Sequence, residues 1–258
     1  CEGLMGEGLD GASVALHVLY MYCCNDAQRL DLCAHQLRSV LMLEGLLQSS
    51  LLEGYSWQQV ALMLLRSADP DTELARHLSE EIINVSANLE TALLCDYCIV
   101  EVLRELLLTF ASVAWPLLGQ ALLSEDYRVR RSMEYLFDVH SYSSRPPLIL
   151  DVPEEILFAW CAETEGAPSS VAGMIPLFDP VEPHDIETVN WTHVAQRFID
   201  EFGTDHNVLR AIETNMYLGT FSGSLVPYYE RNVLAIKQME HHALPQVRRW
   251  ARACIGHH

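Results

Sequence analysis

Lysine is almost missing from this 258-residue chain. Fifteen of its 16 basic side chains are arginine, and Lys237 is the only lysine. A phosphate-binding loop of the Walker type needs a lysine directly after its glycines, and no Gly-Lys pair occurs. Schiff-base chemistry would have to use Lys237. The shortage of lysine therefore excludes one common nucleotide-binding loop and leaves a single candidate for lysine-based catalysis.

Basic charge as a whole is scarce. The chain has 35 acidic side chains and a formal net charge of −19. Nucleic-acid binders depend on basic surface to displace the counterions of phosphates, so this charge argues against a general nucleic-acid binder. Half of the residues are hydrophobic, which excludes a disordered chain. We expect one domain over residues 1–258, with a possible seam at 139–153.

The alternating pattern of β-strands is also nearly absent, and apolar residues recur at helical spacing. The sequence therefore predicts an all-α protein. Proline-rich insertions near 139–187 are expected to form ordered loops, because proline cannot donate a backbone hydrogen bond inside a helix. Charges interrupt the longest apolar stretch, so no membrane span is expected. The expected helices cover 11–24, 27–48, 56–67, 71–94, 96–110, 113–123, 126–138, 154–164, 189–202, 208–216, 225–236 and 247–254.

One segment of the chain occurs twice in similar form. Residues 126–133 (Asp-Tyr-Arg-Val-Arg-Arg-Ser-Met) match residues 244–251 (Leu-Pro-Gln-Val-Arg-Arg-Trp-Ala). The two valines lie about three periods of ~40 residues apart, which is the period of HEAT-type helical pairs. The pattern resembles HEAT-like repeats, in which the second helix opens with a turn, Val-Arg and a small residue. The alternative is an irregular all-α bundle in which the two triplets coincide by chance.

This resemblance implies a fold and several residue roles. The fold would be an irregular α-solenoid of antiparallel helix pairs, forming a module of a larger intracellular protein. Val129 and Val247 would face the core. Arg130 and Arg248 would bind a carboxylate or loop carbonyls of a neighbouring repeat.

The arginines around the repeated segments are the candidate interaction residues. Arg248, Arg249 and Arg252 cannot all face the core, so at least one should be exposed beside Trp250. Arginine and tryptophan are enriched at interface hot spots. The sequence nevertheless favours a core position for Trp250, with the arginines in intramolecular pairs. Arg128 and Arg131 complete the set of candidates.

Histidine and cysteine offer only weak metal sites. His184, His193 and His206 lie in or beside expected loops, but their spacing matches no known ligand pattern. A zinc site from Cys95 and Cys98 with the Cys33-Ala-His35 pair is a further alternative, and buried core cysteines are favoured over it. We therefore predict no metal and no cofactor. Eight unevenly spaced cysteines are typical of reduced thiols in a cytoplasmic protein.

Charge is unevenly distributed along the chain. Residues 151–205 contain 12 acidic residues and one arginine, whereas 206–258 carry a net charge of +3. If the acidic residues share one face, they would steer basic partners toward the protein.

With no recognisable catalytic motif, we expect a non-catalytic protein-interaction or scaffold module whose partners are proteins, basic ones included. Two alternatives stay open. One is an all-α enzyme with a His/carboxylate metal site, and the other is a nucleic-acid-sensing helical domain that uses the arginine clusters at 128–131 and 248–252.

Overall fold

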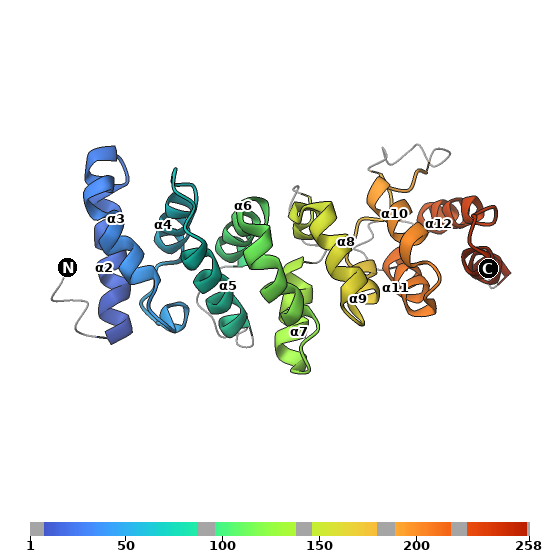
Figure 1. The fold of residues 1–258 in the computed structure, drawn as a ribbon, viewed down its shortest axis with the longest axis horizontal. Helices are drawn as coiled ribbons and strands as arrows, with labels where there is room; N and C mark the ends of the chain where they lie inside the picture. Colours follow the sequence, from blue (N-terminus) through green and yellow to red (C-terminus); the bar gives the residue numbers. More distant parts are fainter. Residues whose placement is uncertain (1–7, 87–95, 138–145, 180–188, 218–225, 257–258) are drawn as a thin grey trace. The chain divides into compact units, whose positions relative to one another are not determined.

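The computed structural model describes residues 8–86, 96–137, 146–179, 189–217 and 226–256. These residues form twelve α-helices and two short 3-10 helices (Figure 1). No strand occurs among them, and Phe178 and Trp191 form an isolated antiparallel bridge. The expected all-α class is confirmed. The solenoid arrangement stays a prediction.

The chain divides into two compact units. The first comprises residues 1–136 and 151–156, and the second comprises 137–150 and 157–258. The single domain expected over 1–258 stays a prediction. Within the described parts of the chain, no helix combines the length and the apolar character that crossing a membrane requires.

The first unit is built around one long helix. α6 packs against α4 and α5, and α2 packs against α3. Trp57 of α4 and Trp115 of α6 are almost fully buried, so aromatic side chains fill this core. The elements of this unit are α2 (Gly8–Cys23), α3 (Ala27–Leu41), the 3-10 helix η1 (Leu46–Gln48), α4 (Gly54–Leu65), α5 (Thr72–Ser86), α6 (Asp96–Leu122) and α7 (Tyr127–Phe137).

Two predicted helices of this unit are longer than the observed ones. The helix expected over 27–48 ends at Leu41, and Gly45 then adopts φ 75°, a left-handed conformation that a continuing α-helix does not allow. The helix expected over 71–94 is described only as far as Ser86, and the remainder lies outside the described residues.

The break predicted between 96–110 and 113–123 appears as a kink inside α6. The backbone at Phe110 has φ −122° and ψ 27°, outside the helical range. Pro116 follows, and its ring lacks the N–H that would bind the carbonyl one turn earlier. The sequence therefore located the break correctly, although the two segments form one bent helix.

The second unit contains the C-terminal helices. α9 packs against α10 and α11, and α13 packs against α11 and α12. Phe158, Phe198 and Phe202 form an aromatic cluster, and the Arg197 guanidinium lies 4.0 Å from the centre of the Phe158 ring. Two elements span the boundary, η2 (Leu148–Asp151) and α8 (Glu154–Glu163). The other elements are α9 (Ala167–Ala172), α10 (His193–Phe202), α11 (His206–Tyr217), α12 (Val226–Met239) and α13 (Pro245–Gly256).

Two expectations for this unit were wrong. The loop predicted over 165–187 contains α9, because Pro168 lies in the first turn of that helix, where no backbone N–H is needed. The helical stripe was expected to start at Val189, but α10 starts at His193. Thr192 caps it by accepting a hydrogen bond from the backbone N–H of Ala195 at 3.1 Å.

Candidate functional site

The two Val-Arg-Arg segments begin α7 and α13, and their first arginines make the same kind of contact. Arg130 donates from Nη1 to the Ser124 carbonyl at 2.8 Å. Arg248 donates from Nη1 to the His242 carbonyl at 2.7 Å, and also to the Ala243 carbonyl at 2.7 Å. In both segments the acceptor lies six residues before the arginine. Each arginine thus fastens its helix to the turn that directly precedes it. The acceptors are loop carbonyls, as the resemblance implied, but they belong to the arginine's own segment and not to a neighbouring repeat.

Burial is also similar in the two helices, with one difference. Val247 is fully buried, as expected, but Val129 is only half-buried, so the core role predicted for Val129 is only partly fulfilled. The next inward positions of α7, Met133 and Leu136, are buried, and so are Ala251 and Cys254 of α13.

The outward faces of the two helices carry different charges. In α7, Arg131 pairs with Glu134 at 3.6 Å. The matching pair in α13 is Arg249 and Arg252, two like charges three residues apart. Both are exposed, and neither makes an ion pair within the described residues. Since α13 contains no acidic residue, it presents two uncompensated positive charges on one face.

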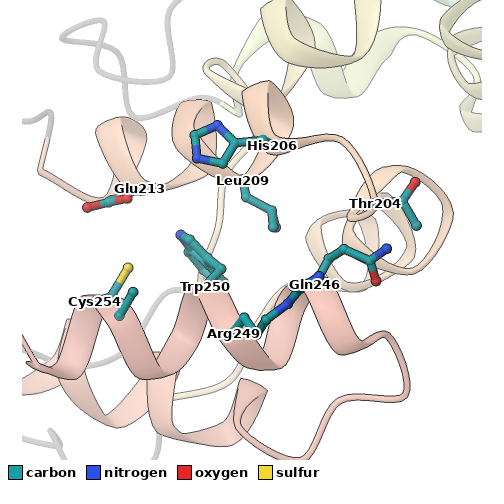
Figure 2. A pocket seen from close by; sticks show the side chains of 9 residues that line it. Thr204, His206, Leu209, Glu213, Gln246, Arg249, Trp250 and Cys254 are labelled. Carbon is teal, nitrogen blue, oxygen red and sulfur yellow. The ribbon is translucent and has the colours of Figure 1, made fainter.

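A pocket of about 590 Å³ lies between the first turns of α11 and the outer side of α13 (Figure 2). Trp250 is half-buried on its wall, so the core position favoured from the sequence is only partly fulfilled. Of the arginines expected to be paired, Arg248 makes intramolecular hydrogen bonds to two carbonyls, whereas Arg249 and Arg252 have no such partner among the described residues. The pocket is lined by Thr204, His206, Leu209, Glu213, Gln246, Arg249, Trp250, Ala253 and Cys254.

A close backbone approach positions α13 beside the start of α11. Gly203 ends α10, and a Cβ atom there would lie 2.3 Å from the Ile199 carbonyl oxygen and 2.8 Å from Cγ2 of Val247. Only glycine allows this contact without a shift of the turn or of α13. The pocket wall therefore depends on a small residue just outside the pocket.

The turn before α13 is fixed to α10 by one histidine. His242 Nδ1 accepts a hydrogen bond from the backbone N–H of Leu244 at 3.1 Å. The Nε2 atom therefore carries the ring proton and lies 3.0 Å from Oδ1 of Asp200. Together with the contacts of Arg248, this arrangement holds the first turn of α13 in place.

The two ends of the pocket differ chemically. Figure 2 shows the Trp250 ring between an end with Glu213 and Cys254 and an end with Arg249 and Gln246. Burial, followed by the nearby charge of Glu213, raises the pKa of the Cys254 thiol to about 12. The indole Nε1 of Trp250 is buried and has no hydrogen-bond partner among the described residues. One end is therefore cationic, and the other carries a carboxylate.

The other predicted candidates lie elsewhere. Arg128 and Arg131 are exposed on α7, in the first unit. His193 and His206 are both exposed, and His206 lines the pocket, whereas His184 lies outside the described residues. Within the described ranges, no three His, Cys, Asp or Glu side chains are placed to hold a metal ion.

The cysteines favour the core interpretation over the zinc alternative. Cys95 lies outside the described residues, and Cys98 is buried. Cys33 is half-buried and His35 is exposed. The core position expected for the cysteines is confirmed for Cys23, Cys98, Cys161 and Cys254.

Several residues that line the pocket have no distinguishing signal in the sequence. The sequence around them shows only an ordinary helix start and an ordinary apolar stripe. The packing of α13 against α11 is what makes a pocket wall of Thr204, Leu209 and Glu213.

Comparison of the chain with protein-family models, with curated proteins and with solved structures gives no match. Function is therefore inferred from the chemistry of the pocket.

Proposed function

We propose that this chain is a non-catalytic interaction module of HEAT-like helical repeats that docks a segment of a partner protein in the α11–α13 pocket. The observation that carries the proposal is an exposed arginine, Arg249, next to a half-buried tryptophan, Trp250, on one pocket wall; in the described part of the chain Arg249 makes no ion pair. These are the residue types that contribute most to binding energy at protein interfaces. The pocket also has the size of a site for two or three side chains.

The contacts of the two arginines support the repeat interpretation. Arg130 and Arg248 each fasten a helix start to the carbonyl six residues earlier. A repeated local structure of this kind is expected when successive helix pairs descend from one unit. Helical repeats commonly use their surfaces to bind other proteins, so fold and pocket favour the same class of function.

The ionisable groups of the pocket do not suit covalent catalysis. A cysteine nucleophile acts as the thiolate. With its pKa raised to about 12, about one Cys254 thiol in 100,000 would be ionised at pH 7. Glu213 beside it raises this pKa further, which is the opposite of what an activated nucleophile requires.

Display of random twelve-residue peptides tests the proposal. We expect the native chain to enrich peptides that the W250A variant no longer captures. Y135A provides a matched control, because Tyr135 is an exposed aromatic residue on α7 and is not among the residues that line the pocket. Circular dichroism checks that each variant is folded. If no peptide is enriched, or if W250A captures the same peptides as the native chain, the proposal is wrong.

A further inference from the structure

We infer that the segment docked in this pocket is acidic and carries an apolar, preferably aromatic, side chain next to its acidic residue. This inference rests on the proposed function and specifies its partner. The juxtaposition that supports it is Arg249 beside the half-buried Trp250 on the pocket wall, with Arg252 exposed three residues further along α13.

The positive charge of α13 is the first feature that selects an acidic ligand. Arg249 and Arg252 share one face of α13, and within the described residues no carboxylate pairs with either of them. Arg248 is less available to a ligand than these two, because its guanidinium is engaged with the carbonyls of His242 and Ala243. A guanidinium binds a carboxylate through two parallel hydrogen bonds, so an Asp or Glu side chain is the group that this face complements.

Such a local positive site is unusual in a chain with a net charge of −19. The overall field repels an acidic ligand at a distance, and only the immediate surroundings of α13 attract it. The arginine pair therefore fixes where and in which orientation an acidic segment can dock. A long polyanion such as nucleic acid, which needs basic surface along many phosphates, fits this distribution poorly.

The apolar wall of the pocket is the second feature that selects the ligand. Leu209 and Ala253 line the pocket together with the Trp250 ring, and Figure 2 shows Leu209 opposite that ring. An aromatic or aliphatic side chain inserted between them would bury apolar surface on both sides.

Glu213 makes the pocket electrostatically asymmetric, which fixes the orientation of a charged ligand. It lies at the opposite end from Arg249, where a second carboxylate of the ligand would be repelled. The ionisable side chains from the two helices that line the site are therefore His206, Glu213 and Cys254, with Arg249 as the cation. The acidic side chain of the ligand lies at the α13 end, and its apolar neighbour lies toward Trp250.

The same random peptide display supplies the test through the composition of the selected peptides. Peptides selected by the native chain should be enriched in Asp or Glu beside an aromatic or large aliphatic residue. R249E/R252E should lose this acidic enrichment. R128E/R131E should keep it, since it reverses two exposed arginines of α7 that lie outside the pocket.

Fluorescence anisotropy of the most enriched peptide then measures the contribution of charge. Replacing its Asp or Glu residues by Asn or Gln should weaken binding to the native chain at least tenfold, and binding to R249E/R252E less than twofold. Selection of neutral or basic peptides that still require Trp250 would overturn this inference and leave the proposed function standing. Binding of a 20-nucleotide single-stranded DNA or RNA at the same affinity, lost in the same variants, would overturn it as well. Failure to select any peptide would reject both.

Discussion

Replacing Arg248 by methionine tests the contact that fastens α13 to the rest of the second unit. Methionine keeps an unbranched apolar stem of similar length but removes the guanidinium. The substitution therefore deletes the two hydrogen bonds, both 2.7 Å long, to the carbonyls of His242 and Ala243. Val247, which is fully buried next to it, should keep its packing.

The magnitude follows from the surroundings of the two carbonyls. A hydrogen bond from a charged donor contributes about 1.5–3 kcal/mol. Its removal costs most where the acceptor is left buried without a partner, and little where water can replace the donor. The bond to His242 is partly buried, whereas the bond to Ala243 is exposed and water can replace it. We therefore expect R248M to lower the free energy of opening of α13 by about 2 kcal/mol, nearly all of it from the His242 carbonyl.

Amide hydrogen exchange read out by mass spectrometry on peptides from α13 measures this free energy. A loss of about 2 kcal/mol corresponds to exchange roughly 30-fold faster for the most protected amides. R249M is the matched control. Arg249 occupies the next position of the same helix but is exposed and makes no ion pair within the described residues, so its exchange should change less than about twofold.

Equal effects of R248M and R249M would refute this account. They would mean that positive charge on the helix, rather than the contact with the preceding turn, determines stability. The equivalence of Arg130 and Arg248 would then lose its physical basis, and with it the main structural support for the repeat interpretation.

Three further outcomes are expected. G203A should destabilise the second unit by about 1–3 kcal/mol in urea unfolding, because its Cβ would overlap the Ile199 carbonyl; unchanged stability would contradict the tight packing of this turn. The hydrogen bond from Arg38 holds the pKa of Asp71 below its usual value, so Asp71 stabilises the fold above pH 4 and this contribution is lost as the pH falls; D71N should flatten the acid side of the stability–pH curve, and a parallel curve would speak against it. Iodoacetamide should label exposed Cys24 about a hundredfold faster than buried Cys254, and equal rates would reject the core position of Cys254.

Local signals predicted most of the helices. The break at Phe110, the start of α13 before Val247 and the end of α10 at Gly203 are all visible in the sequence, because hydrophobic spacing, proline and glycine act within a few residues. The errors have local causes as well. A proline in a first turn does not exclude a helix, as α9 shows, and an apolar residue such as Val189 can be buried without being helical.

The candidate site was predictable only in part. Arg249 and Trp250 were singled out by residue type, and both line the pocket. Leu209 and Glu213 were not, because nothing in the sequence of α11 distinguishes the residues that face α13 from those that face other neighbours. The incomplete burial of Trp250 was likewise missed, since an amphipathic stripe predicts which face is inward but not how closely the next helix covers it.

The sequence by itself determined the helical class, most of the helix boundaries and the concentration of arginine in two matching helix starts, because these depend on interactions between residues close together in the chain. Tertiary structure decided which arginines are engaged and which are not. Arg248 reaches the carbonyls of the preceding turn, whereas Arg249 is left exposed beside a pocket that exists only because α13 packs against α11. The physical reason is that the engagement of a side chain depends on which groups packing brings within hydrogen-bond distance, and packing joins residues that are far apart in the sequence.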